Sequence, residues 1–222
     1  MEKQTLAERT AERLTAMIRA RNYGPGDRLP TEQELMEQLT VGRNTLREAL
    51  RFLVSRNMVV IRQGAGTFVS EKQGVADDPL GFGMVGDQRK LTRDLLAARV
   101  ILEPQIAALA AQNAEEEDIQ RLEEVLLQLE TRMRRREWYA ELDSAFHTAV
   151  AECTHNQVMA RLIPVIADGV RSFAESVEHA EYEETLRSHR RIFEAIRTHR
   201  AVEAQAEMQY HLLFNQKRYG GL

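Results

Sequence analysis

The sequence predicts a mainly α-helical protein made of an N-terminal winged helix-turn-helix and a C-terminal all-helical bundle. Three helical patterns and a hairpin pattern occupy the first 70 residues. Residues 71–90 contain four glycines and little periodicity, and from Leu91 onward apolar residues recur only at helical spacing. Because 222 residues suffice for two cores, we expect domains at 1–70 and 91–222 joined by a linker at 71–90.

The first two helices are predicted from their start signals. Thr5 with Glu8, and Thr31 with Glu34, have the spacing of a capping box, in which the two side chains satisfy free N–H groups at a helix start. A turn rich in glycine and proline at 22–27 separates them. The third helix is predicted from apolar residues at spacing i, i+3, i+4 and i+7, which are Leu46, Ala49, Leu50 and Leu53.

A strand pattern follows the third helix. Met58 to Arg62 and Thr67 to Val69 favour two strands, and the loop between them contains Gly64 and Gly66. Three helices followed by a hairpin are typical of a winged helix.

The C-terminal part is expected to contain helices only. Their ranges are roughly 91–113, 115–136, 138–153, 156–178, 182–198 and 200–217. Pro104 and Pro164 lie inside two of these segments and are expected to kink them or to end them early.

The composition excludes several classes of protein. Hydrophobic residues make up 43% and charged residues 29%, which is typical of a soluble globular chain. No apolar run approaches the roughly 20 residues that span a bilayer, and the N-terminus lacks the apolar core of a signal peptide. We therefore expect a cytoplasmic protein with no membrane partner. The single Cys153 can form neither an internal disulfide nor a thiolate metal site.

The charges are unevenly distributed. The net charge is −4, but residues 1–70 carry 11 Lys and Arg against 8 Asp and Glu, whereas residues 71–222 carry 19 against 26. The basic part is the predicted winged helix, where a nucleic acid would bind.

The third predicted helix has the residues expected of a DNA-reading helix. Arg43, Arg47 and Arg51 form one cationic stripe, with Asn44 and Thr45 beside the first arginine. Arginine can bind guanine with two hydrogen bonds, asparagine can pair with adenine, and arginine or threonine can bind phosphate. A solvated surface helix is the alternative, but the adjoining turn, capping boxes and hairpin favour DNA binding.

These residues resemble the GntR family of bacterial regulators. The resemblance covers nearly all of residues 6–69 and rests on Tyr23-x-Pro25-Gly26-x-x-Leu29-Pro30-Thr31-Glu32-x-Glu34-Leu35, on Val41-x-Arg43-Asn44-Thr45-Leu46-Arg47-Glu48-Ala49-Leu50 and on Gln63-Gly64-x-Gly66-Thr67-Phe68-Val69. It implies a homodimer on a palindromic operator. It also implies Arg43, Thr45 and Arg47 in the major groove and a wing tip at Gly64–Gly66 near the minor groove.

Three positions depart from the family pattern. Thr40 stands where glycine is usual, and Gly42 stands where Ser or Thr is usual, so that a side-chain contact to phosphate is lost or left to the backbone. Gln33 stands where some relatives carry a DNA-contacting arginine. The operator sequence is therefore not transferable.

Four residues of the C-terminal part have the spacing of a metal site. Asp143 and His147 lie four apart on one predicted helix, so both side chains project from one face. His189 and His211 each lie 11 residues from a turn near Arg200, so an antiparallel helical hairpin would bring them together. One carboxylate and three imidazoles suit Zn²⁺, with Ni²⁺ or Mn²⁺ also possible. The spacing alone does not exclude the alternative that Asp143 and His147 are a structural pair joined by a hydrogen bond.

The same segment is similar to the FCD domain of the FadR subfamily. The similarity rests on Asp94-Leu95-x-x-x-Arg99-x-x-Leu102-Glu103, Asp143-x-x-x-His147, His189-x-x-Ile192-x-x-Ala195-Ile196 and Met208-x-x-His211. It implies that Asp143, His147, His189 and His211 bind a divalent metal, which helps to hold a small organic acid. Arg99 matches an arginine that faces the effector cavity in relatives, the alternative being a salt bridge to Asp94 or Glu103.

Together these observations predict a sequence-specific transcription regulator, a repressor whose operator binding responds to a small carboxylate. An activator with the same architecture, or a DNA-binding protein without an effector, stays open. A metal-dependent enzyme is a rival reading, but the sequence offers no general base beside the proposed ligands, and an enzyme does not need the N-terminal module.

Overall fold

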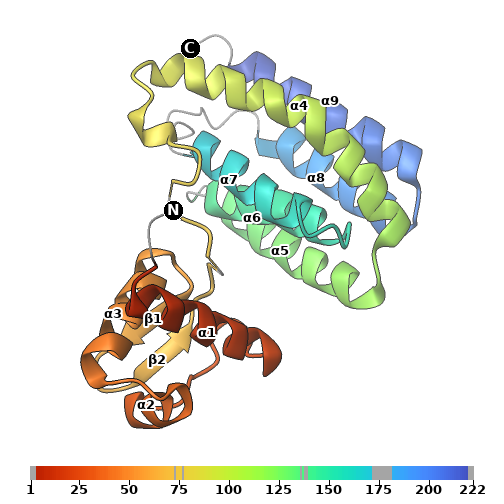
Figure 1. The fold of residues 1–222 in the computed structure, drawn as a ribbon. Coiled ribbons are helices and arrows are strands. Elements are labelled where there is room, and N and C mark those ends of the chain that lie inside the picture. The colour runs from red at the N-terminus through yellow and green to blue at the C-terminus, as the bar shows by residue number, and fades with distance from the viewer. Residues whose placement is uncertain are drawn as a thin grey trace. The chain divides into compact units, whose positions relative to one another are not determined.

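The computed structural model describes residues 4–72, 74–76, 78–135, 137, 140–171 and 182–219. The chain forms two compact units, residues Met1–Pro79 and Leu80–Leu222. Figure 1 shows the elements of each unit, which are described separately below.

The first unit is a winged helix-turn-helix, as predicted. Its elements are α1 (Leu6–Ala20), α2 (Glu32–Leu39), α3 (Arg43–Ser55), β1 (Val59–Arg62) and β2 (Gly66–Val69). Both predicted capping boxes are present, at Thr5 with Glu8 and at Thr31 with Glu34. The apolar faces of the three helices and the hairpin close over one core that includes Leu14, Leu35, Leu46, Leu50, Leu53 and Val59.

Two residues that depart from the family pattern, Thr40 and Gly42, lie just before α3. Thr40 ends α2 in the left-handed region, with φ 52° and ψ 52°, where a β-branched residue is strained. Gly42 is the residue before α3, and no side chain caps the first turn of that helix. Nothing lies within 4 Å of a Cβ added at Gly42, so the N-terminus of α3 is open.

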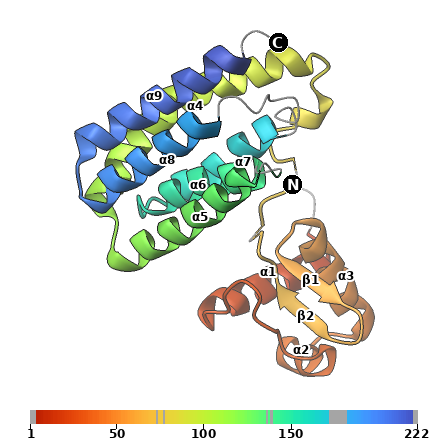
Figure 2. The same cartoon turned by 180° about the vertical axis from the view of Figure 1, so that it is seen from behind.

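The hairpin pairs its strands in antiparallel register, with Val59 opposite Val69 and Arg62 opposite Gly66. Gly64 adopts a φ of 73° in the connecting turn, a conformation that glycine tolerates. Arg28 forms an additional bridge to Phe68, which attaches the segment before α2 to strand β2. Figure 2 shows this hairpin from the opposite side.

The second unit is a bundle of helices, as predicted. Its elements are a 3-10 turn η1 (Phe82–Met84), α4 (Gln88–Asn113), α5 (Glu116–Arg134), α6 (Ala140–Glu152), α7 (Met159–Arg171), α8 (Tyr182–Arg197) and α9 (Ala201–Tyr219). Among the residues of this unit that the structure describes there is no strand. In the described part of the chain, no helix is both long and apolar enough to cross a bilayer.

Some helix boundaries differ from the prediction. Helix α4 begins at Gln88, inside the segment expected to be a linker, because Asp87 caps it by accepting from the backbone N–H of Lys90. Pro104 and Pro164 end neither α4 nor α7. Buried residues of α4 lie on both sides of Pro104, so packing outweighs the one backbone hydrogen bond that a proline removes. The expected range 156–178 extends past Arg171 into residues outside the described ones.

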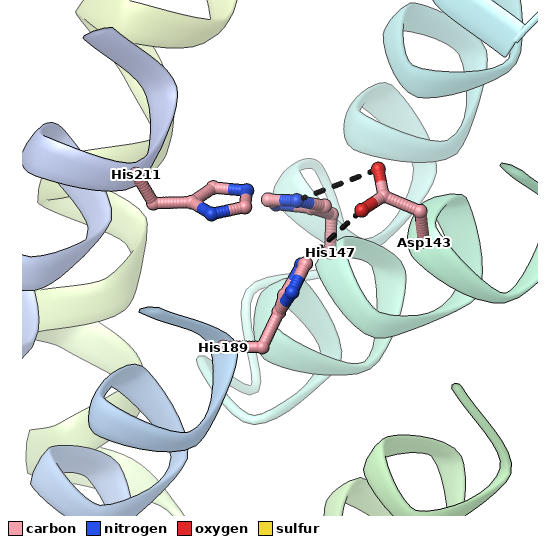
Figure 3. A group of neighbouring side chains, drawn as sticks. All are labelled: Asp143, His147, His189 and His211. Carbon is pink, nitrogen blue, oxygen red and sulfur yellow. Dashed lines mark ion pairs between the residues drawn. The ribbon is translucent and has the colours of Figure 1, made fainter. Parts of the chain in front are cut away.

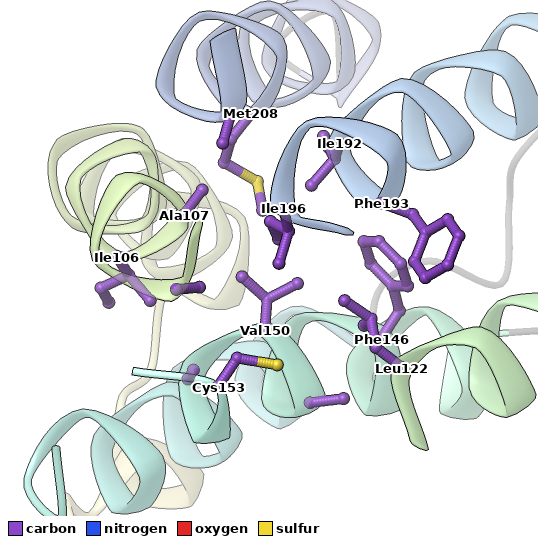
Figure 4. Packing of buried hydrophobic residues seen from close by; sticks show 14 of the residues in the cluster. Ile106, Ala107, Leu122, Phe146, Val150, Cys153, Ile192, Phe193, Ile196 and Met208 are labelled. Atoms are coloured by element: carbon purple, nitrogen blue, oxygen red, sulfur yellow. The ribbon is translucent and has the colours of Figure 1, made fainter. Parts of the chain in front are cut away.

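The core of the second unit forms around α6. Phe146 and Val150 of α6 face Leu122 of α5, Ile196 of α8 and Met208 of α9 (Figure 4). Because α6, α8 and α9 all turn buried faces toward this core, polar residues on those faces are brought together inside the bundle.

Candidate metal centre and DNA-binding surface

The four residues with metal-site spacing meet inside the bundle. Asp143 and His147 come from α6, His189 from α8 and His211 from α9, and their side chains converge in Figure 3. One ligand atom of each lies within 4.8 Å of the others. The three histidines are at most 1% exposed. The helical hairpin of α8 and α9 therefore brings His189 and His211 to one level, as their spacing from the turn predicts.

Close polar contacts orient two of these histidines, an ion pair for His147 and a hydrogen bond for His189. The Nδ1 atom of His147 lies 2.5 Å from the Oε2 atom of Glu103, and the Nδ1 atom of His189 lies 2.8 Å from the carbonyl oxygen of Thr185. A carboxylate and a carbonyl can only accept, so each Nδ1 carries the proton. The Nε2 atom of each ring therefore presents a lone pair.

A short chain of hydrogen bonds orients the third histidine. The Ser188 hydroxyl donates to the Thr185 carbonyl at 2.9 Å and lies 2.8 Å from Nδ1 of His211. Because its one proton is used, Ser188 accepts from the Nδ1–H of His211. The Nε2 atom of His211 then accepts from the side-chain amide of Asn215, whose nitrogen is 3.1 Å away.

The electrostatics favour neutral imidazoles beside an ionised carboxylate. Burial is the largest influence on both His147 and His211. It lowers the pKa of His147 although the carboxylate of Glu103 raises it. Together with the neighbouring histidines, burial lowers the pKa of His211 well below the ordinary value. Burial opposes ionisation of Asp143, but the nearby imidazoles of His189 and His147 hold its pKa well below the usual range. Neutral imidazole and ionised carboxylate are the forms that bind a metal.

This donor set fits a divalent cation. The Nε2 atoms of His147 and His189 are buried and make no hydrogen bond of good geometry with the described residues. They lie 3.9 Å and 3.2 Å from the carboxylate oxygens of Asp143. Lone pairs at such distances repel unless a proton or a cation lies between them. A metal ion bound by the four residues would remove that repulsion, and imidazole with carboxylate suits Zn²⁺.

Arg99 forms a buried salt bridge beside this group, one of the two alternatives that the sequence left open. Its Nε atom lies 2.5 Å from the Oε1 atom of Glu103, and the two side chains are 4% and 2% exposed. Arg99 also acts electrostatically on Asp143 and His147. The arginine therefore lies at the edge of the candidate metal centre.

Glu103 is a site residue whose contact with His147 sequence reasoning missed. Its Oε1 atom accepts from Arg99, and its Oε2 atom makes an ion pair with His147. Although burial opposes its ionisation, the charges of Arg99 and His147 lower the pKa of Glu103 to about 2. The i, i+4 spacing of Arg99 and Glu103 predicts their pair, but no sequence pattern links Glu103 to α6.

The outer face of α3 carries the predicted DNA-reading residues. Arg43, Asn44, Arg47 and Arg51 are exposed and Thr45 is half-buried, whereas the opposite face of the helix is in the core. Arg47 makes an ion pair with Glu32, with Nε 3.1 Å from Oε2. Both side chains are well exposed, so this pair costs little to open when another anion competes for the guanidinium.

Two arginines that sequence reasoning missed lie at the wing, Arg62 at the end of β1 and Arg28 from the segment before α2. Gly64 and Gly66 are exposed in the hairpin turn. A Cβ added at Gly66 would lie 3.2 Å from the guanidinium of Arg28, and the guanidinium of Arg62 lies 4.7 Å from the centre of the Phe68 ring. The wing therefore presents positive charge beside its glycines.

A winged helix with an arginine-rich reading helix, followed by a helical unit with a buried ligand-type cluster, defines a DNA-binding transcription regulator. The family models agree. "Bacterial regulatory proteins, gntR family" matches residues 6–69, and "FCD domain" matches residues 94–214. The chain therefore belongs to the GntR family, with a C-terminal FCD domain.

Named relatives and a solved structure support this assignment. The galactonate operon transcriptional repressor of Escherichia coli is 30% identical over 182 residues, covering 79% of this chain and 80% of that protein. The putative L-lactate dehydrogenase operon regulatory protein of the same organism is 30% identical over 226 residues, covering 94% and 84%. A solved structure, Streptococcus agalactiae GntR, is 38% identical, with a TM-score of 0.83 and coverage of 95% and 99%. Because the family and these relatives are transcription regulators, the chain is a regulator and not an enzyme.

Proposed function

We propose that this regulator is a repressor whose operator binding is modulated by a small carboxylate metabolite held at a metal site in the FCD domain. The observation that carries the proposal is the convergence of three buried imidazoles and the Asp143 carboxylate. The repressor role is supported by the named galactonate operon repressor, to which this chain is similar.

The DNA-binding half of the proposal assigns base contacts to α3. Arg43, Asn44, Thr45 and Arg47 lie on its first two turns, the part of a recognition helix that enters the major groove. Arg51 lies one turn further along and is assigned to phosphate. The wing tip at Gly64 and Gly66, with its arginines, is assigned to the adjacent minor groove.

Each chain has one such helix, so reading a palindromic operator requires two copies. We therefore propose a homodimer whose two-fold symmetry matches that of the operator. The protein would act in the cytoplasm, where bacterial DNA lies.

The metal half of the proposal assigns Zn²⁺ to Asp143, His147, His189 and His211, with Ni²⁺ or Mn²⁺ as alternatives. When bound, the ion would supply a positive centre that attracts a carboxylate oxygen. Arg99 would contribute a second positive group at the edge of the centre while Glu103 holds its Nε. Two cations of this kind suit an organic acid rather than a neutral or cationic metabolite.

Helix α4 offers a route from the effector to the DNA-binding unit. It carries Arg99 and Glu103, and it is the first α-helix after the segment that leads out of that unit. An acid that competes with Glu103 for Arg99 would change the contacts of α4 with α6. Such a change couples the two binding events if the bound and free arrangements differ in their affinity for DNA.

A thermal-shift screen of zinc-loaded protein against small organic acids tests the effector half. A ligand that binds only the folded state raises the melting temperature. We expect at least one acid to stabilise the wild type and to leave a His189→Ala/His211→Ala variant unchanged. A His155→Ala variant, which removes a histidine outside the centre, is the matched control and should respond like the wild type. No stabilisation by any acid, and none by zinc itself, would contradict the metal centre.

A further inference from the structure

We propose that Asn215 is a further residue of the metal centre. Its side-chain amide holds the metal-facing nitrogen of His211 when no metal is bound, and it turns to the anion at the metal once a metal takes that nitrogen. The inference rests on the metal site of the proposed function. Asn215 lies one residue beyond the range that the FCD family model matches.

The position of Asn215 supports this role. It lies four residues after His211 on α9, so both side chains are on the same face of the helix. It is 8% exposed, which places its amide inside the bundle. Its nitrogen is 3.1 Å from Nε2 of His211, the ring nitrogen that lies on the side of the other three ligand residues (Figure 3).

The direction of this hydrogen bond follows from the other side of the ring. Ser188 gives its proton to the Thr185 carbonyl and so accepts from Nδ1–H of His211. The Nε2 atom therefore has a lone pair, and Asn215 must donate to it. An imidazole nitrogen has one lone pair, so it cannot accept from Asn215 and bind a metal at the same time. Metal binding must break the hydrogen bond.

The released amide then needs a new partner. A buried N–H group without an acceptor is costly, so the amide should turn to an acceptor close by. The chemical group that enters the centre together with the metal is the carboxylate of the effector, whose oxygens accept hydrogen bonds. Asn215 would thus oppose the binding of a metal without its anion. Once the metal is bound, Asn215 would favour the binding of the carboxylate.

Zinc affinity separates this role from two alternatives, in which Asn215 is a metal ligand or orients one. The change in zinc affinity when Asn215 is replaced has the opposite sign in those two cases. Removing a donor that competes with the metal should tighten zinc binding by about two- to tenfold, the worth of one hydrogen bond. Removing a metal ligand or a residue that orients one should weaken zinc binding by about 10- to 100-fold. We would measure the zinc dissociation constant by competition with a chromophoric chelator, using the metal alone.

Three variants make the measurement decisive. Asn215→Leu fills the volume of the amide without a donor and keeps water out, and Asn215→Ala checks that the result does not depend on the leucine. Gln209→Ala, an exposed position on the same helix, is the matched control and should leave zinc affinity unchanged. Circular dichroism would verify that each variant is folded. Weaker zinc binding by folded Asn215 variants, or binding equal to the wild type, would overturn the competition.

Acetate serves as the probe for the second part of the inference. With zinc at saturation, acetate should raise the melting temperature of the wild type, and the acetate concentration needed should rise about tenfold in Asn215→Leu. Equal acetate dependence in both proteins would overturn the contact with the anion. If the wild type binds no zinc, the proposed metal site itself fails. If the wild type binds zinc and the Asn215 variants bind it with the same affinity, only the role of Asn215 fails.

Discussion

Replacing Glu103 by glutamine tests the buried network that orients the metal centre. Glu103 accepts from the guanidinium of Arg99 and makes an ion pair with His147, and all three side chains are at most 4% exposed. Removing one partner of a buried ion pair costs about 3–5 kcal/mol, because the remaining charge is left uncompensated. Glutamine retains one oxygen for His147, so we expect the free energy of unfolding to fall by about 3 kcal/mol, the lower end of this range. Zinc affinity should fall by roughly tenfold, because the ring of His147 is less firmly held.

Urea unfolding of the metal-free protein and a zinc competition titration measure these two effects. The matched control is Glu130→Gln, which removes another buried carboxylate. Glu130 accepts from Arg190, but that arginine is 52% exposed and can be solvated when its partner is lost. We expect Glu130→Gln to cost only about 1 kcal/mol and to leave zinc affinity unchanged. An unfolding free energy and a zinc affinity for Glu103→Gln that both equal those of the wild type would refute the role of Glu103.

Three further predictions concern other parts of the chain. Arg47→Ala should weaken binding to a duplex selected from a random library by about 1–3 kcal/mol in a fluorescence anisotropy titration, and an unchanged affinity would contradict the assignment of α3. Thr40→Gly should raise the free energy of unfolding by roughly 1 kcal/mol in urea, because it relieves a β-branched residue at a φ of 52°, and a loss of stability would argue against that strain. His155→Asn tests the ion pair with Asp118 at a backbone position that asparagine tolerates, and its destabilising effect should be larger at about pH 5.5 than at about pH 9. The hydrogen bond and the charge of Asp118 raise the pKa of His155, so its stabilising contribution is complete below the ordinary histidine pKa and is lost as pH rises through the raised value. The reverse pH trend in the difference between wild type and variant would contradict this account.

Local patterns predicted much of the fold. The capping boxes at Thr5 and Thr31 involve residues three apart, so the sequence contains everything needed to recognise them. The face of α3 follows from the period of its apolar residues. The meeting of His189 and His211 could be predicted from their spacing. Two antiparallel helices joined by a short turn place residues that are equally far from the turn at one level.

Contacts between distant helices could not be predicted. The approach of Glu103 on α4 to His147 on α6 depends on how each helix is rotated about its axis and on the level at which the two cross. Helical periodicity gives the buried face but not these two quantities. For the same reason, the contacts of Ser188 and Asn215 with His211 could not be predicted. In the sequence the two residues appear only as polar residues on partly apolar faces. The start of α4 at Gln88 was missed because the linker composition of residues 71–90 masked the cap at Asp87.

The most direct test of the account is a titration of the protein–DNA complex with an effector. Zinc-loaded full-length protein would be bound to a fluorescent duplex selected from a random library, and the organic acid that raises the melting temperature most would be added. We predict a change in DNA affinity by about 5- to 150-fold, the usual range of allosteric coupling, that is absent in His189→Ala/His211→Ala. An acid that saturates the FCD domain and leaves DNA affinity unchanged would contradict the claim that the metal centre controls operator binding.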